Sequence, residues 1–275
     1  MSSSTNKIKF GVNIIYDENI YKAIDFALKN KFSGIELWVV SPQFLIENYS
    51  KKERAKITEY SQKKNIQIQI HAPENISLFE SNKEVWKGYF NYLKELVDFG
   101  RDIKAFSLTI HSGRSSADLL TFPRGQKVLI IDSYPEYFLE VFKKNLKSIS
   151  DYAKGKIFLC IENVDKFDKS VMHIVQKLLN QKRLFLTWDI AKSYNRDGTI
   201  KKEELNFFLK NIKSIKNIHL HDATSISGHE IIGKGVVDFK FFFKKLKNLD
   251  VNYIFEVRPH SNALQSRANL LKILK

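Results

Sequence analysis

The sequence HLHDATSISGHEIIGKGVVDF, residues 219–239, joins the end of one predicted strand to the start of one predicted helix. It places His219 and His221 two residues apart at the end of an apolar run, and a third histidine, His229, lies before a tight Gly-x-Gly turn at Gly233 and Gly235. Because side chains alternate between the two faces of a strand, His219 and His221 project to the same face. This is the geometry of metal ligands, provided that other ligands converge on the same face.

The same alternation of strand and helix extends outward from this stretch over the whole chain. Short β-branched or aromatic runs predict strands at Ile8–Ile15, Ser33–Val40, Ile66–His71, Ala105–His111, Lys156–Glu162, Leu184–Asp189, Ile215–Asp222 and Asn252–Val257. Longer helical periodicities lie between them, at Glu18–Asn30, Lys51–Lys64, Asn82–Arg101, Pro135–Lys154, Ser170–Gln181, Lys202–Asn211, Phe239–Lys247 and Ala263–Leu271. Eight alternating units in 275 residues predict an α/β fold, a single (β/α)8 TIM barrel.

Three helices carry recognisable start signals, and one connection is unusually long. Asp17, Ser133 with Pro135, and Asp168 predict helix N-termini. The connection Ser112–Asp132 follows a strand at the end where barrel active sites form, so we consider it a candidate lid.

Bulk properties indicate one catalytic domain at residues 7–275, after a disordered N-terminal tail at residues 1–6. No stretch approaches the roughly 18–20 apolar residues of a membrane span. The single cysteine, Cys160, cannot form an internal disulfide and agrees with a reducing compartment. We therefore expect a cytoplasmic protein that does not bind membranes.

The net charge of +15 raises the question of a nucleic-acid partner. Most of the excess is lysine, scattered along the predicted helices, and no basic block has interleaved aromatic residues. A solvated lysine-rich surface explains this pattern better than a nucleic-acid site, which stays the less favoured alternative. The sequence leaves the oligomeric state open, and an oligomer is possible.

Carboxylates and imidazoles lie at the carboxyl ends of most of the predicted strands. They are Glu36, His71, His111, Glu162, Asp189, His219, His221 and Glu256. In a barrel these strand ends face one shared volume. A cluster of carboxylates and imidazoles without thiolates suits a divalent ion such as Mn, Co, Mg or Zn, and a cation also allows crowded acidic groups to stay ionised.

The strings IHAPEN, IHSG, CIEN, LTWD, HLHD, GHEIIGKGVVDF and FEVRP, in this order, resemble the xylose-isomerase-like TIM barrel superfamily. That superfamily includes sugar and sugar-phosphate isomerases and epimerases, inosose dehydratases and the endonuclease IV family. The resemblance runs from about Ile8 to the C-terminus. It implies a four-ligand metal site at Glu162, Asp189, His219 and Glu256, in which Glu162 and Glu256 also act as the acid/base pair.

The endonuclease IV pattern matches less completely, although it shares the residues His71, His111, Glu162, Asp189, His219, His229 and Glu256. It has a histidine where this chain has Lys192, and an aspartate where this chain has Ser227. Two of the three ligands of a third metal are therefore missing. A charged lysine is a poor ligand, so the resemblance implies at most two metals.

Several other residues are candidates for weaker roles. His71 and His111 are expected to hold a second ion or to bind substrate, and Lys192, His229, Arg258 and Trp38 are candidates for substrate binding. Each also has an alternative reading: Lys192 as a surface lysine, His229 as a loop anchor, Arg258 as a salt bridge at the rim, and Trp38 as a packing residue. Trp188 is expected to pack near the mouth, with stacking on a sugar as the alternative, and Cys160 is expected in the core.

Taken together, the residues favour a metal-dependent isomerase or epimerase that acts on a small sugar, sugar phosphate or polyol-like substrate through an enediolate. The first alternative is an abasic-site endonuclease related to endonuclease IV. The second is an inactive barrel that serves as a binding module.

Overall fold

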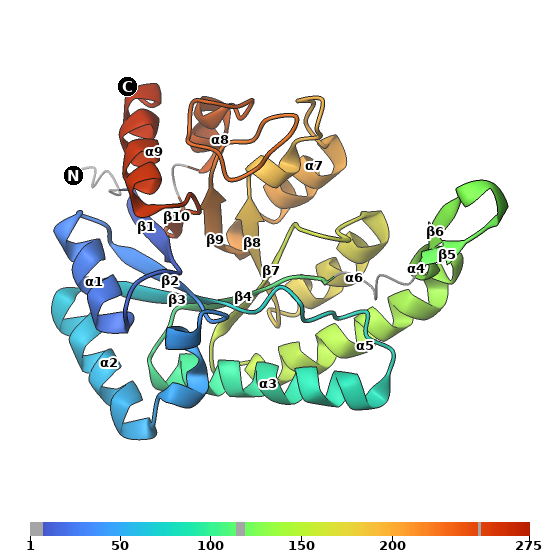
Figure 1. Ribbon diagram of the computed structural model, residues 1–275, viewed down its shortest axis with the longest axis horizontal. Helices are drawn as coiled ribbons and strands as arrows, with labels where there is room; N and C mark the ends of the chain where they lie inside the picture. The colour runs from blue at the N-terminus through green and yellow to red at the C-terminus, as the bar shows by residue number, and fades with distance from the viewer. Residues whose placement is uncertain (1–7, 114–118, 247–248) are drawn as a thin grey trace.

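The computed structural model describes residues 8–113, 119–246 and 249–275. Eight parallel strands close into a barrel in the order β1-β10-β9-β8-β7-β4-β3-β2 (Figure 1). Their bounds are β1 Lys9–Ile14, β2 Gly34–Trp38, β3 Gln67–His71, β4 Ser107–Ile110, β7 Phe158–Glu162, β8 Phe185–Asp189, β9 Ile215–Leu220 and β10 Asn252–Phe255. The prediction of a (β/α)8 barrel is therefore confirmed.

All eight predicted strands are present, and most are shorter than predicted. The pairing between neighbouring strands stops before His111, His221 and Glu256, so these side chains lie just beyond the ladder, at the barrel mouth. Such positions are where barrel enzymes place their functional groups.

Helices surround the barrel. Their bounds are α1 Ile20–Lys29, α2 Lys51–Lys64, α3 Lys83–Asp102, α5 Pro135–Ala153, α6 Lys169–Asn180, α7 Lys202–Lys210, α8 Phe239–Leu246 and α9 His260–Ile273. Strand side chains that point outward pack beneath them; Ile35 and Leu37 of β2 are fully buried there, whereas Glu36 between them faces the barrel interior.

The predicted helix starts at Asp168 and Pro135 are confirmed, but Ser133 is the last residue of a preceding short helix and does not cap the helix after it. Asp168 caps α6 by accepting hydrogen bonds from the backbone N–H groups of Ser170 and Val171, and Pro135 is the first residue of α5. The assignment of Asp17 is wrong, because Asn19 caps α1. Asp17 instead lies 2.7 Å from His260 Nε2, so its carboxylate is engaged in a contact with α9.

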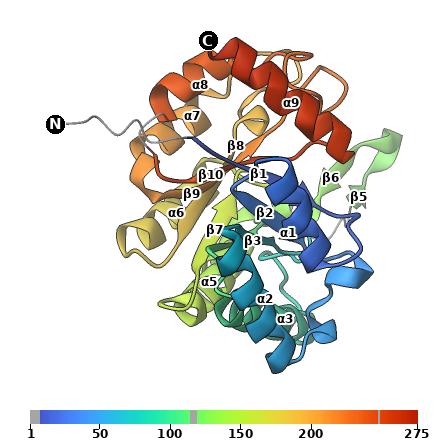
Figure 2. The same ribbon diagram turned by 90° about the vertical axis from the view of Figure 1, so that its left-hand side faces the viewer.

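The long connection after β4 forms an antiparallel hairpin, β5 Leu119–Thr121 with β6 Lys127–Leu129, followed by the short helix α4 Ile130–Ser133. Figures 1 and 2 both show this hairpin projecting outside the helix layer, away from the strands. None of its described residues lines the mouth cavity. The expectation of a lid is therefore wrong for this structure; residues 114–118 of that connection, like the predicted tail at residues 1–6, lie outside the described residues.

The barrel interior below the mouth is polar. Asn217 Nδ2 donates to Glu36 Oε1 at 2.7 Å and lies 3.3 Å from Thr109 Oγ1, which in turn is 2.8 Å from Thr187 Oγ1. These residues lie one layer beneath the mouth and support the side chains above them.

Among the described helices, none combines the length and the apolar character needed to cross a bilayer.

Candidate metal-binding active site

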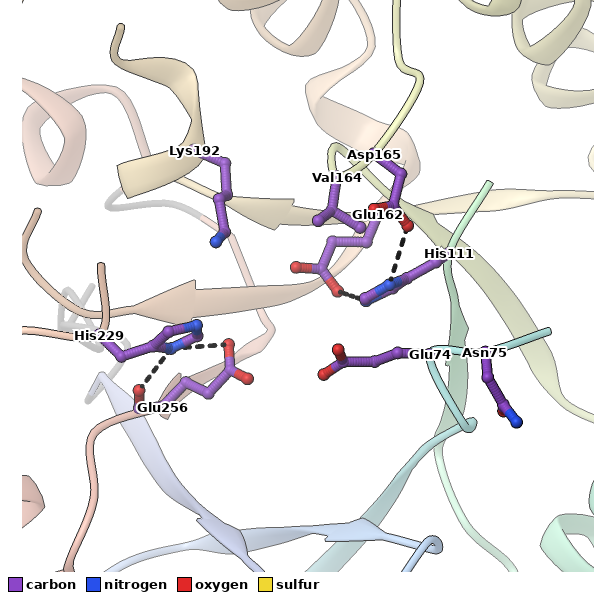
Figure 3. Close-up of a pocket in the computed structure, with 9 residues that line it drawn as sticks. All are labelled: Glu74, Asn75, His111, Glu162, Val164, Asp165, Lys192, His229 and Glu256. Atoms are coloured by element: carbon purple, nitrogen blue, oxygen red, sulfur yellow. Dashed lines mark hydrogen bonds and ion pairs between the residues drawn. The ribbon is translucent and has the colours of Figure 1, made fainter. Parts of the chain in front are cut away.

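A cavity of about 540 Å³ opens at the mouth of the barrel, on the side of the carboxyl ends of the strands. Nine residues line it: Glu74, Asn75, His111, Glu162, Val164, Asp165, Lys192, His229 and Glu256. Figure 3 shows Glu162 and Glu256 reaching into it from opposite sides, with Lys192 between them on a third side.

Four buried side chains converge beneath this cavity. Glu162 ends β7, Asp189 ends β8, His219 lies near the end of β9, and Glu256 directly follows β10. Each offers one ligand atom, and these four atoms all lie within 4.8 Å of one another. The four residues that the family resemblance implies as a ligand set are thus brought together.

His219 is held so that one ring nitrogen faces the carboxylates. Its Nε2 lies 3.0 Å from Glu36 Oε2, and it donates its hydrogen to that buried carboxylate. Glu36, Glu162 and Glu256 outweigh burial and raise the pKa of His219 well above its usual value, so without a bound cation a proton lies on Nδ1. In the neutral ring that can bind a cation, Nδ1 carries a lone pair. Nδ1 is buried, has no hydrogen-bond partner among the described residues, and lies 3.4 Å from Glu162 Oε1 and 3.3 Å from Glu256 Oε2.

This arrangement places a lone pair against two carboxylate oxygens, which is repulsive unless a proton or a cation lies between them. The imidazole and carboxylate donors are those that a divalent transition metal or Mg²⁺ accepts. A histidine whose outer nitrogen donates to a carboxylate is the usual support of a metal ligand. The side chains present therefore fit a divalent cation at this point.

The second oxygen of Glu162 faces two further imidazoles. His71 Nε2 lies 3.2 Å and His111 Nε2 3.3 Å from Glu162 Oε2. The outer nitrogen of His71 lies 2.8 Å from the Ala72 carbonyl, and that of His111 lies 3.4 Å from Asp165 Oδ2. His71, His111 and Glu162 form a second group that could hold an ion.

Asp189 is fixed by three donors. Its Oδ1 accepts from the backbone N–H groups of Ala191 and Lys192, at 3.0 and 3.2 Å. His221 Nε2 donates to Oδ2 at 2.8 Å, and His221 Nδ1 lies 3.0 Å from the His229 backbone nitrogen. No role could be assigned to His221 from the sequence; its contacts show that it orients Asp189 and joins it to the loop after β9.

His229 lies over His221, with ring centroids 4.3 Å apart, and adopts a left-handed backbone conformation with φ 57°. Its Nδ1 donates to the Glu256 carbonyl at 3.1 Å, so Nε2 keeps a free lone pair. Burial lowers the pKa of His229 more than Glu256 raises it, which favours the neutral ring. His221, His229 and Glu256 make a third group of potential ligands.

The electrostatic balance keeps the carboxylates ionised. Burial alone would raise the pKa of Glu162, but His219 and His111 outweigh it and hold this pKa well below its usual range. His219 likewise lowers the pKa of Glu256 against the effect of burial. In the reverse direction, Asp165 and Glu162 overcome burial and raise the pKa of His111 to about 10.

Lys192 lines the cavity, as the sequence suggested, and belongs to a short 3-10 helix, Ala191–Ser193. Its Nζ lies near Gly228: a Cβ placed on that glycine would be 3.9 Å away. Ser227 turns away from the cavity and donates a short hydrogen bond to Glu230. The Lys192 ammonium therefore lies on the side of the cavity where the endonuclease IV pattern places two further metal ligands.

Arg258 and Trp38 form a pair at the rim. The Arg258 guanidinium lies over the Trp38 ring, 4.9 Å from its centre, and Arg258 Nη2 lies 3.4 Å from Glu256 Oε1. Neither residue lines the cavity. Trp188 and Cys160 are fully buried, which confirms Trp188 as a packing residue and Cys160 as a core residue.

The Gly-x-Gly turn is not a phosphate cradle. The backbone N–H groups of Gly233 and Gly235 donate to Asp222 Oδ2 at 2.8 and 2.9 Å, so a carboxylate of the chain itself already occupies the turn. Any Cβ on Gly235 would collide with the Ala223 carbonyl and the Asp222 carboxylate, so only glycine fits there.

Sequence reasoning missed Glu74 and Asp165. Both are acidic residues a few positions after a strand end, Glu74 after His71 and Asp165 after Glu162. In Figure 3 the Glu74 carboxylate points into the cavity and the Asp165 carboxylate contacts His111. One feature of the sequence could have identified both: each is an acidic residue within about three positions of the end of a predicted strand.

The matches to known proteins cover most of the chain. The family described as "Xylose isomerase-like TIM barrel" matches residues 24–274. An uncharacterized protein of Methanocaldococcus jannaschii is 25% identical over 207 residues, which are 74% of this chain and 75% of that protein.

Solved structures with the same fold include a D-tagatose 3-epimerase-like protein, with a TM-score of 0.76 and 20% identity, covering 97% of each chain. The 3-keto-D-glucoside 4-epimerase of E. coli has a TM-score of 0.73 and 13% identity, over 97% of this chain and 100% of that one. The D-psicose 3-epimerase of Clostridium cellulolyticum H10 has a TM-score of 0.70 and 9% identity, over 98% and 100%. At sequence identities of 20% or less, the likeness to these structures shows a shared fold alone.

Proposed function

Because the chain belongs to the xylose isomerase-like TIM barrel family, we propose that it is a divalent-metal-dependent isomerase or epimerase of a small sugar or sugar derivative. The observation that carries the proposal is the convergence of Glu162 and Glu256 on the buried Nδ1 of His219, which has no hydrogen bond within the described residues. The names of the structural neighbours, several of them sugar 3-epimerases, agree with it.

Glu162, Asp189, His219 and Glu256 would hold the ion. When bound, a divalent ion polarises the carbonyl of a sugar and stabilises the negative charge that develops on its oxygen. The nitrogen and oxygen donors suit Mn, Co, Mg or Zn. His71 and His111, together with Glu162, are the candidates for a second ion or for hydrogen bonds to the substrate.

Glu162 and Glu256 are the proposed acid/base pair. A proton next to a carbonyl is removed by a base on one face of the carbon, and a group on the opposite face can return a proton with inverted configuration. Both carboxylates have lowered pKa values, which favours the ionised form that accepts a proton. The carboxyl group that returns a proton on the opposite face must first take one up from solvent, so one of the pair is ionised and the other protonated when the reaction begins. If the proton returns to the neighbouring carbon instead, the same pair performs an aldose–ketose isomerisation.

Other cavity residues have the chemistry to bind hydroxyl groups. His229 presents a neutral Nε2 as an acceptor, Lys192 presents an ammonium donor, and the Glu74 carboxylate points into the centre of the cavity. Arg258 and Trp38 support the rim from behind Glu256, so we propose for them an indirect role through the position of that carboxylate.

Conversion of sugars by the metal-loaded protein tests the proposal. We expect Mn- or Co-loaded protein to convert at least one ketose or ketose phosphate of a panel into its epimer or aldose isomer, as detected by chromatography. Glu162→Gln and Glu256→Gln should each reduce the rate by about 10²–10⁴-fold. Glu203→Gln, at an exposed position of α7, serves as the matched control and should keep full activity. Protein that binds no metal after reconstitution would contradict the proposal.

One observation favours phosphodiester cleavage at an abasic site as a second candidate. Three groups of potential ligands lie side by side and share Glu162 and Glu256, which resembles a cluster for several ions. Lys192 lies beside the third group and disfavours a third cation by repulsion. A duplex with one abasic site should therefore stay intact with the metal-loaded protein. Clean incision that is lost in His219→Ala would favour the nuclease.

A further inference from the structure

A second cavity, of about 310 Å³, adjoins the active site at Lys192. Its walls are the loop after β8, residues 194–201, and the loop after β9, residues 223–228. Lys192 lines both this cavity and the cavity at the barrel mouth, so the two meet at its side chain. We call the second one the side cavity.

The two cavities have opposite charge. Four carboxylates line the mouth cavity, those of Glu74, Glu162, Asp165 and Glu256, against two cations, Lys192 and His111, whose pKa is raised to about 10. The side cavity is lined by Lys192, Arg196 and Lys201, and none of its lining residues in the described part of the chain is acidic. Thr224, Ser225 and Ser227 line it as well.

The walls of the side cavity are held by hydrogen bonds within each loop. In the loop after β9, Asp222 and Glu230 exchange two backbone hydrogen bonds of 2.9 Å, and Thr224 Oγ1 accepts from the Ser227 N–H at 3.1 Å. In the other loop, Tyr194 and Ile200 form an antiparallel bridge. A cavity with such walls exists before a ligand arrives, which reduces the entropy cost of binding.

Lys201 connects the basic groups. Its Nζ donates to the Lys192 carbonyl at 2.7 Å, so it fixes the short helix that carries Lys192. Arg196 lies in the same loop as Lys201 and is exposed. Its guanidinium offers several donors in one plane, which matches the oxygens of a phosphate or a carboxylate.

We propose that the side cavity binds an anionic group of the substrate, a phosphate or a carboxylate, while the sugar end of the same molecule reaches Glu162 and Glu256. This rests on the proposed function, and it narrows the substrate class from small sugars in general to anionic sugar derivatives. Lys192 lies where the two ends of such a molecule meet, since among the described residues it alone lines both cavities.

Binding of inorganic phosphate tests the site without reference to catalysis. Calorimetric titration of the metal-loaded protein should show one phosphate bound, and Arg196→Gln should weaken it about 10-fold or more, the usual loss for one hydrogen bond to a charged group. The control is Lys202→Gln, an exposed lysine next to Lys201 that does not line the side cavity. It should bind phosphate like the wild type. Equal weakening in both variants, or no phosphate binding in the wild type, would overturn the proposal.

Kinetics then distinguish the two anionic groups and separate this inference from the proposed function. A ketose phosphate and a keto-uronate are compared with the neutral ketose of the same chain length. We expect one anionic compound to have the highest kcat/KM, reduced about 10-fold or more in Arg196→Gln, while the neutral ketose is unaffected. A neutral ketose that is turned over best, with no effect of Arg196→Gln, would sink the inference and leave the proposed function standing. Arg196-dependent phosphate binding without turnover of any sugar would contradict the proposed function and leave the anion site in the side cavity standing.

Discussion

Glu36 Oε2 lies 3.0 Å from Nε2 of His219, although the two residues are 183 positions apart in the chain. Both side chains are fully buried in the barrel interior. This contact fixes the His219 ring and turns its other nitrogen, Nδ1, toward Glu162 and Glu256. The geometry of the candidate metal site thus depends on a carboxylate one layer beneath it.

Glu36→Gln should weaken metal binding about 10–100-fold, the usual effect of removing a carboxylate that supports a histidine ligand. The amide is nearly the same size but is a weaker acceptor than the carboxylate, and it no longer favours hydrogen on His219 Nε2. Competition with a chelating dye would measure the affinity for Mn or Co.

A matched control for this variant is Gln69→Met. Gln69 pairs with Glu36 in the barrel and is equally buried, but its side-chain nitrogen donates to Ser107 Oγ rather than to a ligand. The metal affinity of this variant should equal that of the wild type. Equal loss in both variants would mean that the interior layer matters only for stability.

Gly235→Ala should destabilise the fold by about 1–3 kcal/mol or more, since the added methyl group would overlap with Ala223 and Asp222. It would also push the Asp222 carboxylate away from the four backbone N–H groups that donate to it, those of Ala223, Gly233, Gly235 and Val237. Urea unfolding measures the effect. Gly88→Ala is the control: a Cβ there meets no other group, and in the middle of α3 it should stabilise the helix by about 0.5–1 kcal/mol.

Glu204→Gln should change the pH dependence of stability. Burial raises the pKa of Glu204 from 4.5 to about 7, and its Oε1 accepts hydrogen bonds from Asn163 and Ser193. Since the folded protein binds this proton more tightly than the unfolded chain, the contribution of Glu204 is complete below about pH 4.5 and is lost as the pH rises through about 7.

The glutamine variant lacks this proton equilibrium. The free energy of unfolding of the wild type, relative to that of Glu204→Gln, should therefore fall by up to about 3 kcal/mol between pH 4.5 and pH 8. Urea unfolding at several pH values gives both curves. A constant difference between them would show that Glu204 titrates normally.

The fold could be predicted from the sequence because it follows from local patterns, whereas the choice of four ligands among the residues at the strand ends was implied by the family resemblance. Alternation of strands and helices determines a parallel barrel, and a barrel brings the carboxyl ends of its strands together. Glu162, Asp189, His219 and Glu256 lie at or near such ends, so their convergence required no knowledge of loop conformation.

Residues whose position depends on loops or on depth in the barrel could not be placed in this way. Glu36 was grouped with the residues at the mouth, but it lies one layer deeper and contacts His219 from below. The bond between His221 and Asp189 and the contact between Asp165 and His111 depend on how the loops turn. The hairpin β5–β6 escaped prediction because its two strands are only three residues long.

The most direct test of the central claim is solvent deuterium exchange into a ketose or ketose phosphate by the Mn- or Co-loaded protein. We expect deuterium at the carbon next to the carbonyl, at a rate that falls about 10²–10⁴-fold in Glu162→Gln and in Glu256→Gln and that depends on the metal. Incorporation would establish proton transfer even if the preferred substrate is missing from the panel. Metal-loaded protein that exchanges no deuterium into any member of a broad panel, phosphorylated and carboxylated sugars included, would contradict the claim.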